Sequence, residues 1–217
     1  LAETLTNIFE NGEEAFGYAA VEDLGDGRGY TAGRVGFTTG TGDALELIEL
    51  YNRTSTTTQA KALTRYLPEL RHLSSLNRCD TGRASTSQLH GFDKAWKVAA
   101  LKDPAFPKAQ DTLNDQMYMT PGRRFAATLN VTSPLGQALF YDTIIQHGWQ
   151  LTEPDINIQR IIALTGERKE NECESTYLTR FLHTRRSLLC CYPDTTWPDA
   201  ADRISDLQGV LENKDLQ

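Results

Sequence analysis

The chain has 217 residues, of which 39% are hydrophobic and 24% charged, and this suits one globular domain better than two independent ones. Its net charge of −7 argues against a nucleic-acid partner, which needs clustered Lys and Arg, and is compatible with a cationic one. No apolar run approaches a membrane span, so we expect no membrane partner. The opening Leu1-Ala2-Glu3 lacks the features of a signal peptide, as expected of a mature secreted protein or of a trimmed cytosolic one.

The first predicted element is a helix over residues 2–10. Leu5, Ile8 and Phe9 follow helical spacing, and the Asn-Gly pair at 11–12 predicts the end of the helix. Glu10 is therefore expected at the C-terminal end of this helix, beside apolar residues.

A glycine-rich region follows, and it breaks the helical pattern. Seven of the sixteen glycines lie between Gly25 and Gly42, a density that no stable helix tolerates. Short β-prone pieces at 30–31 and 35–39 lie between these glycines and predict two or three short antiparallel strands with tight turns.

The rest of the chain has mostly helical patterns. Further helices are predicted at residues 43–52, 59–76, 91–102, 105–119, 134–147, 156–169 and 174–191, with a short amphipathic stretch after 199. Pro68 is expected to kink or break the helix at 59–76, while Pro134 and Gly148 mark the start and end of another. The expected loops are 53–58, 79–87 and 103–107.

The four cysteines leave several states open. Cys190 and Cys191 are adjacent, and adjacent cysteines rarely bond to each other. With Cys79 and Cys173 the set allows one or two disulfides, and buried free thiols are equally compatible with the sequence. Neither the cysteines nor the histidines have the spacing of a zinc site, so we expect no metal and no cofactor.

Asp26 lies in the most informative segment, residues 22–31. Glycines on both sides of Asp26 allow a sharp turn and leave the carboxylate open to a ligand. Arg28 lies two residues further on, on the same side if the backbone is extended, where it would keep Asp26 ionised.

Three common glycine-rich motifs do not fit this region. In a calcium loop starting at Asp23, the third position is Gly25 and the twelfth is Arg34, which are not ligands. A dinucleotide fingerprint is excluded by the glycine spacing, and a phosphate loop is excluded because the Gly-Thr-Gly run ends in Asp43. From composition alone, a tight polar turn without a catalytic role remains an equal alternative.

The segment 22–31, with Gly36-Phe37 and the Gly-Thr-Gly-Asp run at 40–43, closely resembles the N-terminal core of glycoside hydrolase family 46, the bacterial chitosanases. Residues 140–148 and 174–185 are also similar to this family. The resemblance spans roughly residues 5 to 190 and is densest before residue 50. It implies a single catalytic domain, 1–217, with two lobes. The implied fold is α+β, mostly helical and lysozyme-like, with a small antiparallel sheet near the N-terminus and a substrate cleft between the lobes.

The resemblance also implies an inverting endo-hydrolase that cuts β-1,4 linkages in chitosan. It implies Glu10 as the acid and Asp26 as the base, supported by Arg28 and by Thr31, which would position the attacking water. The residues that it implies for substrate binding are Tyr18, Glu22, Asp43 and His147. These roles agree with the physical requirement that an inverting enzyme has one protonated and one ionised carboxyl group, with room for water between them.

A second group of residues is interpreted as structural. Asp142 and Arg185 each fall on the apolar face of a helix, and charges there must be paired. The resemblance suggests that Asp142 lies between Arg185 and Arg168 in a buried ion network.

The resemblance implies chitosan and glucosamine oligosaccharides as partners, secretion to the extracellular space, and a monomer. Two rivals remain. One is a lysozyme-like hydrolase acting on chitin or peptidoglycan, and the other is a non-catalytic binder of polycations. The acidic residues Glu22 and Asp43 favour a cationic sugar over the first rival, and the presence of both catalytic carboxylates argues against the second.

Overall fold

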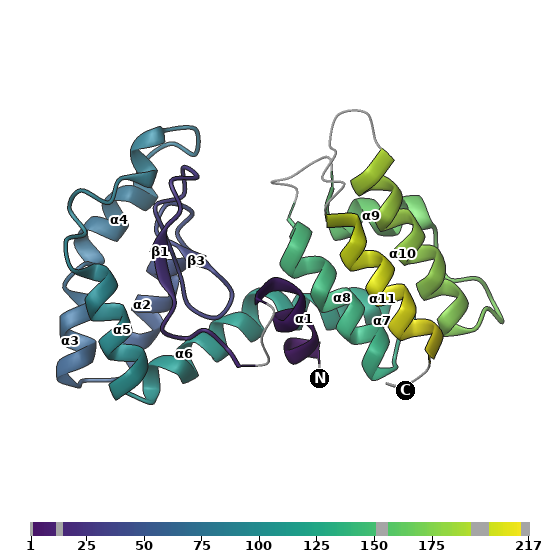
Figure 1. Ribbon diagram of the computed structural model, residues 1–217, viewed down its shortest axis with the longest axis horizontal. Helices are drawn as coiled ribbons and strands as arrows, with labels where there is room; N and C mark the ends of the chain where they lie inside the picture. The colour runs from purple at the N-terminus through teal and green to yellow at the C-terminus, as the bar shows by residue number, and fades with distance from the viewer. Residues whose placement is uncertain (1, 12–14, 151–155, 192–199, 214–217) are drawn as a thin grey trace. The chain divides into compact units, whose positions relative to one another are not determined.

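The chain forms two compact units, each with its own core. A computed structural model describes residues 2–11, 15–150, 156–191 and 200–213, with the backbone alone at 9–11 (Figure 1). Unit 2 comprises Phe16–Asp115, and unit 1 combines Leu1–Ala15 with Gln116–Gln217. Unit 1 is therefore built from both ends of the chain.

Unit 2 contains the sheet. Its strands are β1 (Val21–Asp23), β2 (Tyr30–Ala32) and β3 (Phe37–Thr38), in the order β1-β2-β3 with both pairs antiparallel. The helical elements of this unit are α2 (Asp43–Thr54), α3 (Thr58–Thr64), α4 (Leu67–Ser75), the 3-10 helix η1 (Thr81–Ala84), α5 (Phe92–Lys102) and α6 (Ala105–Asn114).

The two faces of the sheet differ in character. Ala32 and Phe37 are cross-strand partners, and both are buried. Because side chains alternate between faces, the neighbouring row of Glu22, Thr31 and Thr38 lies on the opposite face. One face thus packs into the core, and the other presents polar groups.

The core of unit 2 is aromatic. Tyr51, Phe92, Trp96 and Phe106 are fully buried, and the rings of Trp96 and Phe106 meet edge to face with centroids 4.8 Å apart. This packing joins α2, α5 and α6 and supports the sheet, because Tyr30 of β2 stacks on Phe92.

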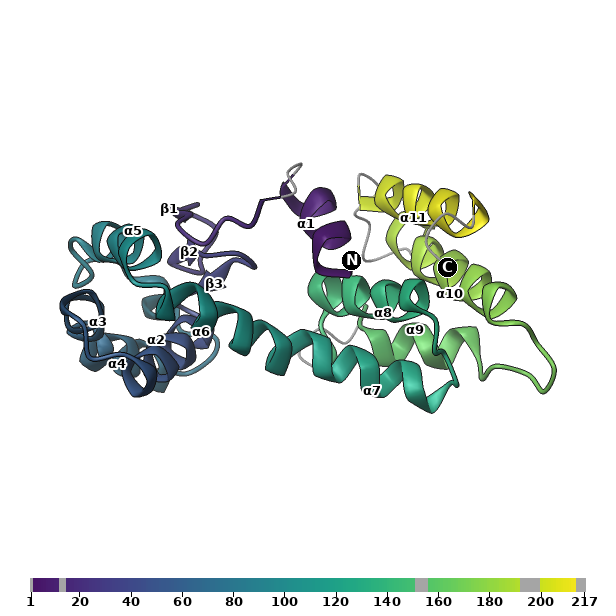
Figure 2. The ribbon, with the colours of Figure 1, turned by 90° about the horizontal axis from the view of Figure 1, so that it is seen from below.

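Unit 1 is helical. Its elements are α1 (Ala2–Asn11), the C-terminal part of the π-helical η2 (Asp115–Met119), α7 (Thr120–Thr128), α8 (Pro134–His147), α9 (Ile158–Thr165), α10 (Glu174–Cys191) and α11 (Ala201–Asn213). Helix α8 is apolar nearly all round and lies at the centre of the unit, with α1 beside it (Figure 2). Buried side chains from α7 to α11 form one continuous core.

The predicted class, a mostly helical chain with a small antiparallel sheet near its N-terminus, is confirmed. The bounds predicted for 134–147 and 174–191 agree with α8 and α10. The predicted helix 59–76 is two helices, with Pro68 in the first turn of α4, where no amide hydrogen is needed. The single helix predicted at 105–119 was too long, because α6 ends at Asn114. It is followed by η2 and by α7, which was not predicted.

The sequence left the state of the cysteines open, apart from the expectation that the adjacent pair does not bond, which was wrong. Cys190 and Cys191 form a disulfide at the last two residues of α10. Cys79 and Cys173 are free, but they are exposed, because each lies in a segment that precedes a helix and not on a core face. Within the described residues, none of the helices is both long and apolar enough to cross a membrane.

Candidate active site

The loop between β1 and β2 holds an aspartate–arginine pair. Gly25, Gly27 and Gly29 all have positive φ, so this tight hairpin requires glycine at alternate positions. The guanidinium group of Arg28 donates to Asp26 Oδ2 from Nε at 2.8 Å and from Nη2 at 2.6 Å. The turn therefore fixes the carboxylate by a forked, charge-assisted contact.

This pair keeps Asp26 ionised. The hydrogen bond from the Arg28 side chain is the main cause of a pKa for Asp26 below the ordinary value of 3.8. From the part of the chain that the structure describes, Asp26 Oδ1 accepts one hydrogen bond, donated by the Arg28 backbone amide at 3.0 Å. A carboxylate oxygen has two acceptor positions, so Oδ1 retains one for a water molecule.

The polar face of the sheet adds two further groups beside this loop. Glu22 is exposed, and among the described residues its carboxylate has no hydrogen-bond or ion-pair partner. Its cross-strand neighbour Thr31 has a buried hydroxyl that bonds to no other described group. Because an unsatisfied buried hydroxyl is costly, we expect solvent or substrate to supply its partner.

Asp43 begins α2 and is held through one oxygen. Its Oδ1 accepts from the amide of Thr38 at 2.8 Å, the hydroxyl of Thr41 at 2.7 Å and the amide of Ala44 at 3.0 Å. No described residue donates to Oδ2. Burial raises the pKa of Asp43, and these hydrogen bonds oppose that effect. The arrangement leaves one carboxylate oxygen available for a cation.

Tyr18 is part of the framework of unit 2. Its hydroxyl donates to Asp111 at 2.8 Å, and its carbonyl accepts from the indole of Trp96 at 2.9 Å and from Gln110 at 3.0 Å. Its predicted contact with substrate stays a prediction.

In unit 1, Glu10 is the penultimate residue of α1, as expected from the sequence. Its side chain lies outside the described residues. One helical turn earlier, the hydroxyl of Thr6 donates to Asp142 Oδ1 at 3.2 Å. Helix α1 is thereby attached to α8 close to the residue predicted as the acid.

Asp142 is the centre of a buried network. Arg185 of α10 donates to its Oδ2 at 2.8 Å, and Arg203 of α11 donates to its Oδ1 at 2.5 Å. Asp142 and Arg185 are fully buried. Burial alone would raise the pKa of Asp142, but the two guanidinium groups outweigh it and hold the pKa below 3.8. With Thr6 included, one carboxylate joins four helices.

His147 lies at the end of α8 and is buried. Arg185 Nε donates to its Nε2 at 3.1 Å. Burial, and then the charges of Arg185 and Arg203, lower the pKa of His147 from 6.5 to about 2, so the ring is neutral. Its predicted role in substrate binding stays a prediction.

The second arginine of the network was assigned wrongly. Arg168 donates to the carbonyls of Glu172 and Asn130 and lies 4.0 Å from Glu174, whereas Arg203 contacts Asp142. Arg168 follows α9 and is used to close the loop before α10. The tail after 199 is predicted only as an amphipathic stretch. Arg203 beside its apolar residues indicates a charge that needs a partner, but not which partner.

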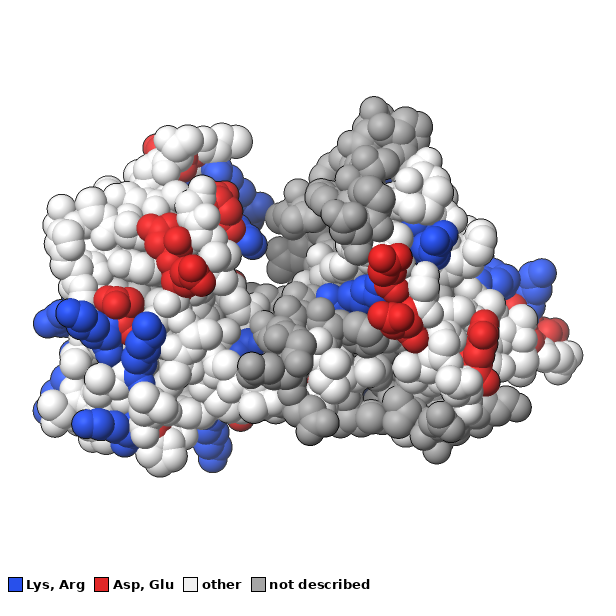
Figure 3. All heavy atoms as spheres, viewed as in Figure 1, with Lys and Arg blue, Asp and Glu red and all other residues white. Residues whose placement is uncertain are grey.

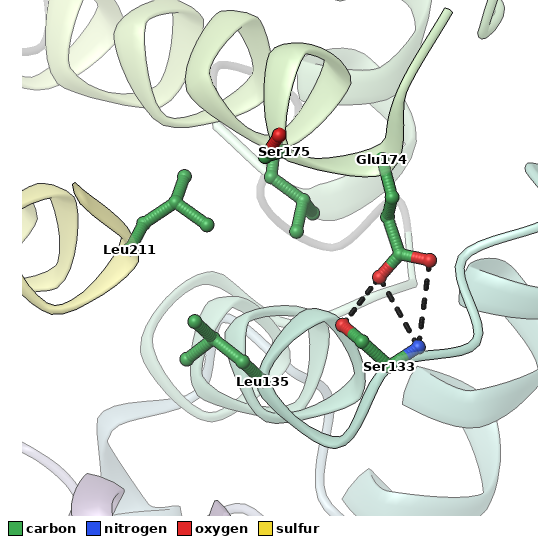
Figure 4. A pocket seen from close by; sticks show the side chains of 6 residues that line it. Ser133, Leu135, Glu174, Ser175 and Leu211 are labelled. Carbon is green, nitrogen blue, oxygen red and sulfur yellow. Dashed lines mark hydrogen bonds between the residues drawn. The ribbon is translucent and has the colours of Figure 1, made fainter. Parts of the chain in front are cut away.

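A surface pocket in unit 1 contains none of the predicted site residues. Figure 4 shows its lining, which consists of Ser133, Leu135, Glu174, Ser175, Leu178 and Leu211. The carboxylate of Glu174 accepts from the amides of Thr132 and Ser133 and from the Ser133 hydroxyl, while Ser133 caps α8. Glu174 is thus used to fix the start of α8. Among the described residues, no group of three or more His, Cys, Asp or Glu could hold a metal ion.

The mostly helical fold with its small antiparallel sheet belongs to the lysozyme-like class of glycoside hydrolases. Residues 4–217 match the model of glycosyl hydrolase family 46, and the chain belongs to this family.

The chitosanase of Bacillus subtilis (strain 168) is 39% identical over 220 residues, covering 97% of this chain and 76% of that protein. Among solved structures, a mutant chitosanase from Bacillus subtilis MY002, complexed with 6 GlcN, has a TM-score of 0.80 and 36% identity over 99% of this chain and 88% of that one. A family 46 chitosanase from Gynuella sunshinyii, in complex with chitotetraose, has a TM-score of 0.79 and 31% identity, with coverage of 99% and 88%.

Proposed function

We propose that this protein is an endo-acting chitosanase that hydrolyses β-1,4 linkages between glucosamine units with inversion. The single observation that carries the assignment of the site is the forked Arg28–Asp26 contact in the glycine hairpin, next to Thr31. The similarity to proteins named chitosanases, one of them complexed with 6 GlcN, supports the choice of substrate.

In this mechanism Asp26 is the general base. Arg28 keeps it ionised, and its Oδ1 has room to accept a proton from water. The water oxygen attacks the anomeric carbon as its proton passes to Asp26. Thr31 holds the same water through its hydroxyl, which bonds to no other described group.

Glu10 is the general acid. It donates its proton to the leaving glycosidic oxygen while the bond to the anomeric carbon breaks, which releases the sugar without a charged alkoxide. Asp142 supports this step indirectly, because it anchors α1 through Thr6, one turn before Glu10.

Substrate selection rests on carboxylates that pair with glucosamine ammonium groups. Asp43 offers Oδ2 while its Oδ1 is held by the protein, and Glu22 offers an exposed carboxylate. Tyr18 and His147 complete the proposed binding residues. An acetylated sugar has no such charge, so chitin and peptidoglycan are expected to be poor substrates.

The test compares Glu10→Gln and Asp26→Asn with the unmodified protein on chitosan and on fully acetylated chitin. We expect fast cleavage of chitosan alone, and a loss of at least about 10²-fold in kcat for each variant, the usual scale for general acid–base groups. Asp206→Asn, exposed on α11, is the matched control. Faster cleavage of chitin would contradict the substrate, and an active Asp26→Asn variant would contradict the base.

Stereochemistry is a separate readout. Proton NMR of fresh product should show the α-anomer first, since attack from the opposite face inverts the β linkage. An initial β-anomer would mean a retaining mechanism.

We further propose that the protein works outside the cell as a monomer. A polymeric substrate does not cross membranes. Among the described residues, the large exposed hydrophobic side chains are few and lie on separate elements, except for Val98 and Leu101, which share α5. Activity in the culture medium and a monomer mass by light scattering are the expected results.

A further inference from the structure

Arg83 of η1 makes an unusual set of contacts outside the residues assigned above. It donates to four backbone carbonyls: Gly40 at 2.7 Å, Leu76 at 2.8 Å, Ser74 at 3.1 Å and Thr41 at 3.3 Å. Among the described residues it has no carboxylate partner. Four of its five N–H donors are thus used to hold backbone.

These carbonyls belong to two different segments. Ser74 and Leu76 lie at the C-terminal end of α4, where carbonyls have no partner within the helix. Gly40 and Thr41 belong to the loop that leads into Asp43. Arg83 therefore fastens the loop before α2 to the end of α4.

Gly40 links this loop to the hairpin. Its amide donates to the carbonyl of Arg28 at 2.9 Å. A Cβ at Gly40 would lie 2.8 Å from that carbonyl oxygen and 3.1 Å from the carbonyl oxygen of Arg83. Gly40 is thus packed between the two backbones, and a shift of Gly40 would move Arg28, which holds Asp26.

Thr41 links Arg83 to Asp43. Its carbonyl accepts from Arg83, and its hydroxyl donates to Asp43 Oδ1. One guanidinium group is therefore two contacts away from the carboxylate that we assign to ammonium binding, and it reaches the assigned base through Gly40 and Arg28.

We infer that Arg83 is a positioning residue, which fixes the position of the Arg28–Asp26 pair relative to the Thr41–Asp43 pair. This inference rests on the proposed roles of Asp26 and Asp43. Misplacing a catalytic group by about 1 Å costs on the order of 10²-fold in rate, so loss of this single anchor is expected to be visible in kinetics.

The experiment measures kcat, KM and the pH profile on glucosamine hexamer for Arg83→Met and Arg83→Lys. Methionine removes all donors. Lysine keeps the charge but cannot reach four diverging carbonyls from one nitrogen. We expect Arg83→Met to lower kcat/KM about tenfold or more, through a lower kcat as well as a higher KM. The acidic limb of its pH profile should move to higher pH. Arg83→Lys should fall in between. Arg78→Met, an exposed arginine five residues earlier, should match the unmodified protein.

Double variants separate positioning from general stability. If Arg83 acts through Arg28 and Asp43, its loss combined with Arg28→Met or Asp43→Asn should cost clearly less than the sum of the single losses. Full additivity in both pairs, or a folded Arg83→Lys variant with unchanged kcat/KM and pH profile, would overturn the inference.

Asp26→Asn in the same series tests the proposed function itself. If that variant is active, the assignment of the base fails, whatever the Arg83 variants show. If it is inactive and the Arg83 variants behave like the unmodified protein, only the inference about Arg83 fails.

Discussion

Two aspartates only 17 positions apart have opposite environments. Asp26 lies on an open hairpin, where Arg28 lowers its pKa, while burial raises the pKa of Asp43 at the start of α2. The first is suited to accept a proton over a wide pH range. The second is poised to bind an ammonium group, which would favour its ionised form.

Removing the guanidinium group beside Asp26 should shift the pH profile. In Arg28→Met the main cause of the lowered pKa is lost, so the pKa of Asp26 rises toward its ordinary value of 3.8. A base works only when it is ionised, and the acidic limb of kcat/KM therefore moves to higher pH. The measurement is kcat/KM on glucosamine hexamer across the acidic range.

Arg71→Met is the matched control for this shift, because Arg71 pairs with Glu49 on the exposed surface of unit 2. Its acidic limb should coincide with that of the unmodified protein. An unmoved limb in Arg28→Met would contradict the role given to Arg28.

At the scale of elements, the buried network joins α1, α8, α10 and α11 through one carboxylate. Its charges also keep His147 neutral. Because the pKa of His147 is lowered on folding, the unfolded chain binds the proton more readily. The contribution of His147 to stability is therefore present above pH 6.5 and is lost as the pH falls below it toward about 2.

His147→Gln should flatten this pH dependence. In the unmodified protein, His147 contributes a decline in the free energy of unfolding of up to about 1.4 kcal/mol per pH unit below pH 6.5. The lowered pKa of Asp142 affects the free energy of unfolding only at lower pH, below 3.8. Urea unfolding between about pH 5 and pH 7 should show a shallower slope in His147→Gln, whereas His183→Gln, exposed on α10, should keep the original slope.

The sequence was sufficient for helices with strong apolar patterns or clear end signals, such as α8, which has Pro134 and Gly148 at its ends. It also indicated the hairpin, because only glycine takes positive φ at low cost. The sequence was insufficient where contacts between residues far apart in the chain determine the structure. Arg203 reaches Asp142 across 61 positions, and Arg83 reaches Gly40 across 43, and no local pattern encodes such pairs.

For the whole molecule, charge is expected to act on association more than on chemistry. The net charge is −7, and Figure 3 shows acidic and basic side chains interspersed on the face that it draws. A polycation is attracted to such a surface over a distance that salt reduces to about 10 Å at 0.1 M.

We therefore expect kcat/KM on chitosan to fall as sodium chloride rises from about 20 mM to about 200 mM, mainly through KM. A partly acetylated chitosan of equal length, which carries fewer charges, should show a weaker dependence. Equal salt dependence for the two polymers would argue against electrostatic capture.

The composition of unit 1 has a consequence for biosynthesis. Helix α1 precedes segment 16–115 along the chain, yet the Asp142 side chain that fixes it follows 136 positions after Thr6, and Arg203 follows 61 positions later. Segment 16–115 is continuous and can fold as soon as it is synthesised, whereas the partners of α1 within unit 1 are complete only once Arg203 has been added. The helix that carries Glu10 is thus synthesised well before the residues that secure it, so we expect it to dock late in folding.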